Sequence, residues 1–280
     1  MAELKDSFPT VLLPENDPVI SDLKEKLEST PNYHEELGAY VQFTPMTLDE
    51  AAAVLREGKV DIVIGGLVED SADVLRTAIK QVNRVVAPDK RETITSFFAM
   101  EKEGQDPIFL ADCAVHEKPD TDTIVTIAEH TAQSVKDLGF EPVVAFLSLS
   151  SFGSASHLES VQNVKDAADK FKAAHPDIIS YGEIQADAAL NSRIFQKKAN
   201  KAGVELVDGK MPNVFVFPDG TSGNLAYKFL EQLAGHVAVG PMLNGVELDF
   251  HDLSRGATVE ALEKSIRYAA LLHKARKSRA

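Results

Sequence analysis

Short apolar runs alternate with runs of helical period along most of this chain. In its first third, strand-like runs lie at residues 9–14, 40–44 and 60–66, and runs with helical spacing lie at 17–29, 47–58 and 71–82. The second helix is expected to begin at the capping residue Thr47 and to stop at Gly58. A β-α-β-α order of this kind predicts a mostly parallel sheet covered by helices.

The middle and the end of the chain keep this alternation, with one interruption. Residues 93–100 and 107–113 are both strand-like with no helical run between them, which predicts a hairpin or an antiparallel edge pair. Beyond them, helices are predicted at 121–139, 158–174, 187–199, 223–235 and 259–275, and strands at 143–149, 213–218 and 237–243. Thr258 is the expected cap of the last helix. The whole pattern predicts an α/β protein.

Charge and cysteine content narrow the possible partners and compartment. With 280 residues the chain can form two domains, and its formal net charge of −14 argues against a nucleic-acid partner or an anionic membrane surface. The single cysteine, Cys113, allows no intramolecular disulfide, which favours the cytoplasm, and its place after an apolar run predicts a buried, inert thiol. No run is long and apolar enough to span a bilayer, and the N-terminal residues lack the pattern of a signal peptide.

Three turns between a predicted strand and a predicted helix are rich in glycine and serine. They lie at residues 64–73, 148–157 and 217–224. Free N–H groups at a helix start attract anions, and ligands of open α/β sheets bind at the carboxyl ends of strands. One such turn commonly does no more than cap a helix, whereas three of them favour a phosphorylated ligand. The segment 251–260, HDLSRGATVE, is judged too polar for a core and is either a surface loop or an anion site.

Common catalytic signatures are missing from the sequence. It contains neither of the glycine-rich nucleotide loops G-x-G-x-x-G and G-x-x-x-x-G-K-[ST], no H-E-x-x-H and no Cys/His cluster. The run SSFGSAS lacks the G-x-S-x-G nucleophile elbow. We therefore expect neither a metal nor a serine-hydrolase triad.

Several longer stretches, in a fixed order, resemble a known family. FLADCAV, EPVVAFLSLSSFGSASH, YGEIQADAAL, NVFVFPDGTSGNLAYK, VGPMLNG and DLSRG resemble the phosphate acetyltransferase/phosphate butyryltransferase family, and SADVLRTAIKQV resembles its upstream arginine helix. The resemblance covers roughly residues 60–275, and the N-terminal portion is similar only at VLLPENDPVISDL. The shortened start is more like the compact acyltransferases of the butyryl type.

The resemblance implies a reaction and an architecture. The reaction is acyl-CoA plus phosphate giving acyl phosphate plus CoA, with coenzyme A as a substrate and no other cofactor. The fold is two α/β/α domains with a cleft between them, similar to isocitrate and isopropylmalate dehydrogenases, assembled as a homodimer. The first domain is expected at 1–97 plus 246–280 and the second at 98–245.

The same resemblance implies roles for individual residues. Ser254 matches the family serine at the reacting centre, Arg255 its phosphate-binding neighbour, and Arg76 another arginine at the cleft. An ion pair between Arg255 and a nearby acid such as Asp252 is the purely structural alternative. Phosphate- or CoA-binding segments of the family match Ser150, Ser151, Gly153, Ser154 and Asn224.

Four departures from the family pattern bear on catalysis. The aspartate proposed as the family's base is replaced by Ala261, and the adjacent Glu260 is the candidate substitute, although one residue turns a helix by about 100°. A family arginine is Gln232 here, a lysine before DLSRG is missing, and SSFGS lacks the lysine of STKGS.

These departures leave a second hypothesis from another functional class. A non-catalytic acyl-CoA-binding protein of the same fold would resemble the C-terminal domain of some malic enzymes, which is regulatory, but that domain typically loses the SRG that this chain keeps. A dehydrogenase of the isocitrate type would need clustered metal-binding aspartates with arginines, which the sequence does not show.

Overall fold

The computed structural model describes residues 9–14, 18–29, 40–82, 85–87, 90–91 and 93–279. It divides into two compact units, Met1–Ile94 with Val237–Ala280 (unit 1) and Thr95–His236 (unit 2), which are considered separately. The predicted domain boundaries after residues 97 and 245 thus differ from boundaries after Ile94 and His236. The second boundary falls earlier because the strand that follows it packs against the C-terminal helix.

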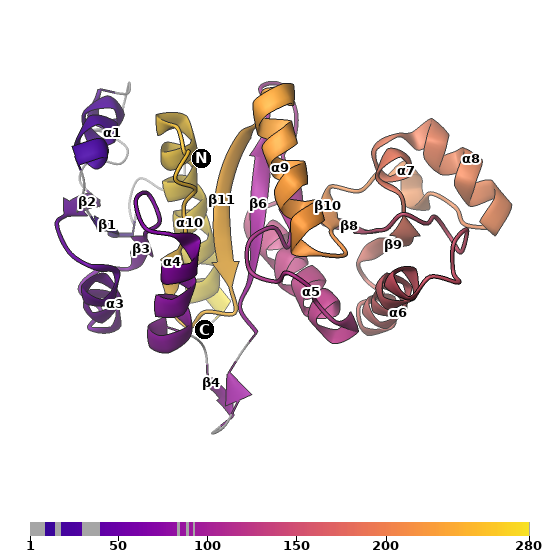
Figure 1. The fold of residues 1–280 in the computed structure, drawn as a ribbon, viewed down its shortest axis with the longest axis horizontal. Coiled ribbons are helices and arrows are strands. Elements are labelled where there is room, and N and C mark those ends of the chain that lie inside the picture. Colours follow the sequence, from indigo (N-terminus) through magenta and orange to yellow (C-terminus); the bar gives the residue numbers. More distant parts are fainter. Residues whose placement is uncertain are drawn as a thin grey trace. The chain divides into compact units, whose positions relative to one another are not determined.

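Unit 1 contains a four-stranded parallel sheet in the order β12-β3-β1-β2. Its elements in chain order are β1 (Val11–Pro14), α1 (Pro18–Glu28), β2 (Val41–Thr44), α3 (Leu48–Arg56), β3 (Ile62–Ile64), α4 (Ser71–Thr77), the π-helix η2 (Ala78–Val82), β4 (Val85–Ala87), β5 (Lys90–Arg91), β11 (Val237–Asn244), β12 (Asp249–His251) and α10 (Val259–Arg279) (Figure 1). In the sheet Val11 lies opposite Val41 on one side and Ile62 on the other.

Two helix starts in unit 1 agree with the sequence prediction. Thr47 caps α3 in a reciprocal capping box, because its hydroxyl accepts from the Glu50 N–H at 3.3 Å and Glu50 Oε2 accepts from the Thr47 N–H at 2.8 Å. Thr258 Oγ1 likewise accepts from the Ala261 N–H at 3.1 Å, at the start of α10. Both predicted caps are confirmed.

Unit 2 is a second α/β layer system whose strands lie in the order β6-β7-β10-β8-β9. Its elements are β6 (Thr95–Glu101), β7 (Ile108–Ala111), α5 (Thr121–Asp137), β8 (Val143–Leu147), α6 (Glu159–Ala174), β9 (Ile179–Ile184), α7 (Ala186–Leu190), α8 (Ser192–Ala202), the 3-10 helix η3 (Val207–Gly209), β10 (Val214–Val216) and α9 (Gly220–Ala234). Strands β7, β10, β8 and β9 are parallel, while β6 runs antiparallel to β7 with Phe98 opposite Leu110. The predicted antiparallel pair is therefore confirmed.

The core of unit 2 is aromatic and explains how its helices attach. Phe98 stacks on Tyr227 of α9 with ring centroids 4.1 Å apart, and Phe146 meets Phe171 of α6 edge to face at 5.5 Å. Helices α5 and α6 also pack against each other.

Among the described residues, no helix combines the length and the apolar character that crossing a bilayer would require.

The structure contains strands that the sequence prediction lacked, and it divides one predicted helix. Strands β9 and β12 were not predicted, because their side chains are polar or small at several positions. The single helix predicted over 187–199 is two helices, since Asn191 interrupts it and caps α8 by accepting from the Arg193 and Ile194 N–H groups.

The expectation that residues 251–260 are too polar for a core is wrong for their first part. His251, Asp252 and Leu253 are at most 1 % exposed. They are buried because β12 adds to the edge of the parallel sheet of unit 1 and carries them beneath α10.

Candidate functional site

The parallel strands β3 and β12 of unit 1 end side by side, and their carboxyl ends carry the DLSRG segment. His251 lies opposite Ile64, and the Gly65 N–H donates to the His251 carbonyl at 3.0 Å. This pairing sets the turn after β3 against the residues that follow β12. Such a strand edge is where ligands of α/β sheets bind.

Asp252 is the first side chain of this edge, and sequence reasoning did not place it in the site. Its Oδ1 accepts from the Leu253 N–H at 2.9 Å, whereas its buried Oδ2 has no hydrogen-bond partner among the described residues. Burial raises the pKa of Asp252 to about 6, although hydrogen bonds from Ser71 and Leu253 act in the opposite direction. The available sequence signal was the position of Asp252 directly before a serine and an arginine, but the run looked too polar to be buried.

Ser254 and Arg255 come next and emerge at the surface. Ser254 is half-buried, and its Oγ accepts a hydrogen bond from the Gly256 N–H at 3.4 Å. Arg255 is exposed and pairs with Asp70, its Nη1 lying 2.6 Å from the Asp70 Oδ1. The ion pair considered from the sequence was with Asp252, so the structure names a different acid.

Arg76 lies on α4 and forms an ion pair with an acid in the first turn of that helix. Its partner is Asp73, three residues earlier. It borders a cavity of about 320 Å³ that it shares with Lys80 and with Thr47, Leu48, Asp49, Glu69, Asp73 and Thr77. The side chains of Arg76 and Arg255 are 57 % and 66 % exposed, and ion pairs at such exposure contribute only about 0–1 kcal/mol. An incoming anion could therefore displace Asp70 or Asp73 at small cost.

Glu260 and Ala261 sit at the start of α10 in different environments. Ala261 is buried, whereas the Glu260 side chain is 60 % exposed and its Oε1 lies 3.2 Å from Lys264 Nζ. A carboxylate in an exposed ion pair is a weak candidate for accepting a thiol proton. The role of Glu260 as a base stays a prediction that its surroundings do not favour.

A buried ionic cluster behind β12 anchors the strand that carries these residues. Asp249 Oδ2 lies 2.6 Å from His273 Nδ1, and its Oδ1 lies 2.8 Å from Arg276 Nη2, both on α10. Burial alone would raise the pKa of Asp249, but hydrogen bonds from His251 and His273 and the charge of Arg276 hold it far below its usual value. His251 Nδ1 accepts from the Leu243 N–H at 3.2 Å, and burial lowers the pKa of His251, so its ring is neutral.

In unit 2 the loop after β8 holds four of the predicted residues, and three of them are hydrogen-bonded to Glu183 or Gln185. Ser150 Oγ donates to Glu183 Oε1 at 2.8 Å, and the Gly153 N–H donates to the same oxygen at 2.6 Å. Ser151 Oγ donates to Gln185 Oε1 at 3.1 Å. Ser150 and Ser151 are buried, so their hydroxyls shape the loop and do not face a ligand.

Of the predicted residues in this loop, Gly153 and Ser154 are exposed. Ser154 Oγ accepts from the Ser151 N–H at 3.0 Å and donates to Ser150 Oγ at 3.2 Å, because Ser150 gives its own proton to Glu183, so this exposed hydroxyl keeps one acceptor position for a ligand. Glu183, fully buried on β9, organises the loop and was missed, because an acid within YGEIQ gives no sequence signal of a loop anchor.

Asn224 lies at a different place, the N-terminal part of α9. Its Nδ2 donates to the Cys113 carbonyl at 3.2 Å. It borders a cavity of about 380 Å³ formed by residues 113–117 and by Gly220, Thr221, Asn224 and Leu225. Cys113 itself is buried, as predicted, and burial followed by the charge of Asp112 raises the pKa of its thiol well above the usual value.

The predicted residues thus form three groups. Arg76, Ser254 and Arg255 lie around the carboxyl ends of β3 and β12, the residues 150–154 form the loop after β8, and Asn224 lies on α9 after β10. Because β8 and β10 are parallel neighbours, the last two groups both lie at the carboxyl ends of these strands. Within the described part of the chain, no three His, Cys, Asp or Glu side chains are grouped so that they could hold a metal ion.

Comparisons with known proteins agree on one family. A family model described as phosphate acetyl/butaryl transferase matches residues 19–270. A phosphate acetyltransferase of Thermoanaerobacterium thermosaccharolyticum is 38 % identical over 73 % of this chain and 62 % of its own length. One of Paracoccus denitrificans is 37 % identical over 79 % of this chain and 69 % of its own length. The chain thus covers less than two thirds of the first of these relatives.

Solved structures support the same fold. EutD phosphotransacetylase from Staphylococcus aureus superposes with a TM-score of 0.74 at 24 % identity, covering 98 % of this chain and 96 % of that one. A structure from Salmonella typhimurium that carries the name of a 4-hydroxythreonine-4-phosphate dehydrogenase gives a TM-score of 0.52 at 12 % identity, over 94 % and 99 % of the two chains. At these identities the likeness concerns the fold alone, and it confirms the predicted dehydrogenase-like α/β architecture.

Proposed function

The chain belongs to the phosphate acetyl/butyryl transferase family, and on that premise we propose that it transfers an acyl group reversibly between coenzyme A and inorganic phosphate. The observation that carries the proposal is the strand end where Ser254 and Arg255 follow a buried Asp252. Acetyl and other short or branched acyl groups are the substrates we propose, with CoA as a substrate and without a metal or a further cofactor.

In the direction that consumes acyl phosphate, the CoA thiolate attacks the carbonyl carbon and the bond from that carbon to the phosphate oxygen breaks. Negative charge grows on the carbonyl oxygen and on the departing phosphate, so donors aimed at these oxygens lower the barrier. Ser254 supplies a hydroxyl donor, and Arg255 binds the phosphate once its ion pair with Asp70 is broken. Arg76, with Lys80 beside it, binds a further phosphate of the substrate.

Unit 2 supplies positioning groups in this proposal. The Ser154 hydroxyl at the carboxyl end of β8 and the Asn224 side chain on α9 are polar groups at one sheet edge. Ser150, Ser151 and Gly153 keep the loop in shape by binding Glu183 and Gln185. Substrate contact on this unit therefore falls mainly to Ser154 and Asn224.

We propose that two copies associate through α9. Leu225, Phe229 and Leu233 follow one another at four-residue spacing on this helix, and each is more than half exposed. Exposed apolar stripes of this size commonly mark an interface with another protein surface. The homodimer acts in the cytoplasm on this proposal, in keeping with a buried thiol and no disulfide.

The experiment that tests the function is release of CoA or acyl-CoA formation from acetyl, propionyl, butyryl and isobutyryl phosphate, followed at several pH values. Turnover with at least one acyl phosphate is expected, and it should not change after treatment with a chelator. Tight acyl-CoA binding with no turnover on any of the four would refute the enzyme and favour a regulatory binding protein.

A further inference from the structure

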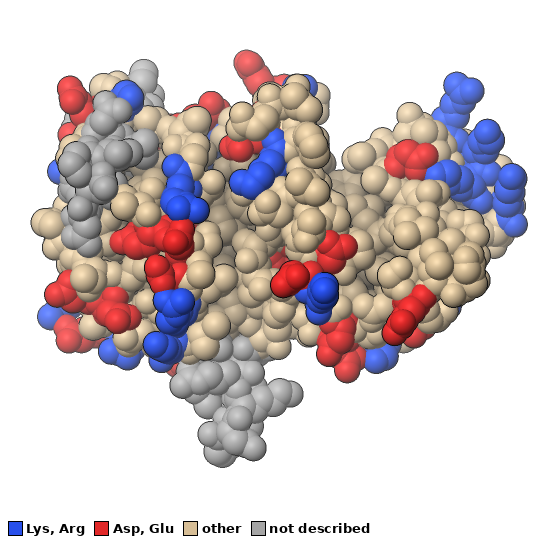
Figure 2. Space-filling view, in the orientation of Figure 1, with Lys and Arg blue, Asp and Glu red and all other residues tan. Residues whose placement is uncertain are grey.

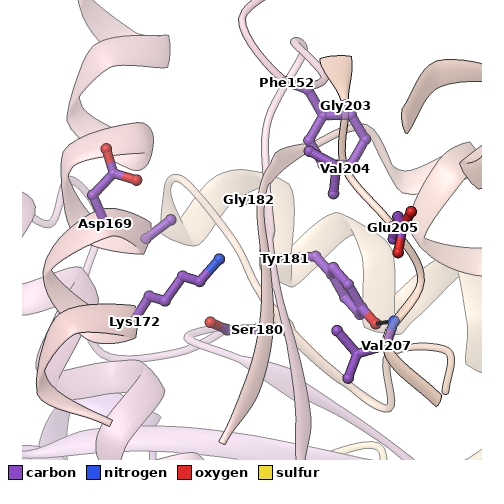
Figure 3. A pocket seen from close by; sticks show the side chains of 11 residues that line it. Phe152, Asp169, Lys172, Ser180, Tyr181, Gly182, Gly203, Val204, Glu205 and Val207 are labelled. Atoms are coloured by element: carbon purple, nitrogen blue, oxygen red, sulfur yellow. Dashed lines mark hydrogen bonds between the residues drawn. The ribbon is translucent and has the colours of Figure 1, made fainter. Parts of the chain in front are cut away.

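A cavity of about 430 Å³ lies along the free edge of the unit 2 sheet, and Phe152 is its lining residue from the loop after β8. It is bounded by β9, by the second half of α6 and by residues 203–207 (Figure 3). Strand β9 is the last strand of its sheet and pairs only with β8 among the described strands. Small-molecule sites in proteins typically have volumes of roughly 300–1,000 Å³.

One side of this cavity presents two polar groups without a partner. Figure 3 shows Lys172 reaching from α6 toward β9, with Ser180 near it on the same side of the strand. Neither side chain makes a hydrogen bond or an ion pair within the described part of the chain. The nearby Asp169 is paired with Lys165, whose Nζ lies 2.7 Å from its Oδ2. Lys172 is therefore the available cation on this side.

The other side of the cavity is mostly apolar, with one carboxylate at Glu205. Tyr181 uses its hydroxyl fully, accepting from the Val207 N–H at 2.9 Å and donating to the Lys210 carbonyl at 3.2 Å, so it offers only its ring. Val204 and Phe152 complete this wall, and the exposed carboxylate of Glu205 also lies on this side (Figure 3). The charges thus favour an anionic group beside Lys172 and not beside Glu205.

We propose that this cavity binds a small organic carboxylate, with a flat apolar body against Tyr181 and Phe152 and its carboxylate held by Lys172 and Ser180. An apolar wall with a few polar groups at one end is the usual composition of a ligand pocket. A carboxylate accepts from an ammonium and a hydroxyl together.

The ligand would also contact the loop that shapes the proposed substrate edge. Phe152 lies between Ser151 and Gly153, has a left-handed φ of 52°, and its N–H donates to the Glu183 carbonyl at 2.9 Å. Its ring meets Phe195 edge to face at 5.7 Å, and Phe195 meets Tyr181 at 4.9 Å. An occupant that presses on Phe152 therefore changes the surroundings of the Gly153 N–H.

The test uses 2-naphthoate as the probe, with 2-naphthylmethanol and 2-naphthylmethylamine as its neutral and cationic counterparts. Binding to the full chain is measured by calorimetry and by amide chemical shifts. We expect saturable 2-naphthoate binding, weakened about tenfold in Lys172→Met and unchanged in Lys197→Met, which removes a similarly exposed lysine outside the cavity. Val204→Trp, which fills the cavity, should abolish binding, and the Gly153 amide should shift in the wild type.

Three outcomes would overturn the proposal: no saturable binding at millimolar probe, equal binding of the amine, or full affinity in Lys172→Met. Binding without a shift at Gly153 would overturn the contact with the loop. Circular dichroism of each variant checks that it is folded. None of these measurements uses acyl transfer, so their failure is distinguishable from failure of the proposed function.

Discussion

The Cα of Gly66 lies directly against the carboxyl group of Asp252. A Cβ at residue 66 would stand 1.9 Å from Asp252 Oδ1 and 2.7 Å from the Leu253 carbonyl oxygen, and the φ of Gly66 is +88°. The backbone of the turn after β3 thus packs against the Asp252 side chain that follows β12. Because Ser254 and Arg255 follow directly, their position depends on this contact.

We expect Gly66→Ala to destabilise the protein more than Gly58→Ala. Both glycines have a positive φ, which costs an alanine about 1 kcal/mol, but Gly58 has open space where a Cβ would be. The clash at Gly66 adds about 1–3 kcal/mol. Urea unfolding of the two variants measures the difference, and equal losses of unfolding free energy would contradict the contact.

The raised pKa of Asp252 predicts a pH-dependent stability. The pKa of Asp252 is about 6 in the folded protein and has its ordinary value of 3.8 in the unfolded chain, so the folded state holds the proton more tightly. Its contribution is therefore full below pH 3.8, is lost as pH rises to about 6, and amounts to about 2–3 kcal/mol. Asp249 has the opposite sign, because its pKa is lowered, and its stabilisation is lost only as pH falls below 3.8.

Asp252→Asn cannot titrate, so its stability relative to the wild type should rise between pH 4 and pH 7. Urea unfolding of both proteins across this range gives the difference in unfolding free energy. Asp169→Asn, which removes an exposed carboxylate, should show no comparable trend. A difference between Asp252→Asn and wild type that is constant with pH would refute a buried, titrating Asp252.

Arg255→Ala and Arg76→Ala should lower kcat or raise KM for acyl phosphate or phosphate about tenfold or more, because each charge-assisted contact to phosphate is worth about 1.5–3 kcal/mol. Their melting temperatures should hardly change, since the ion pairs with Asp70 and Asp73 are exposed. Lys59→Ala, which breaks a comparable exposed pair with Glu57, is the control. Lost stability with intact kinetics would show that the arginines are structural.

The general fold was predictable because most elements follow simple apolar patterns. The β6–β7 pair follows from two apolar runs without a helix between them, and α3 follows from a run of helical period between the capping residue Thr47 and Gly58. Strand β12 was not predictable in this way. Its Asp249 and His251 look like surface residues until the partners His273 and Arg276 on α10 are known, and that contact depends on the fold.

The site was predictable by residue type but not by partner. The DLSRG motif points to Ser254 and Arg255, but nothing in the sequence connects Arg255 to Asp70 across the chain. The loop serines also had an ambiguous pattern. Glycine and serine after a strand suit both a ligand and a self-bonded turn, and only the buried Glu183 distinguishes them at Ser150.

The missing aspartate at Ala261 leads to the sharpest kinetic prediction. A CoA thiol near its unperturbed pKa of about 8.5 is only a few per cent ionised at neutral pH, and a positioned base typically contributes about 10²–10⁴-fold. Glu260 is exposed and ion-paired with Lys264, so we expect a slow enzyme whose rate rises steeply with pH as the thiol ionises in solution. Ser254→Ala should then lower the rate more than Glu260→Gln.

Ala261→Asp should raise kcat near pH 7 by about tenfold or more and flatten the pH profile, while Ala261→Asn, equally bulky at this buried position, should not. Rates of CoA consumption between pH 6 and pH 9 test this, with circular dichroism to confirm that both variants fold. A fast wild type with a flat profile around neutrality, abolished by Glu260→Gln, would instead identify Glu260 as the base.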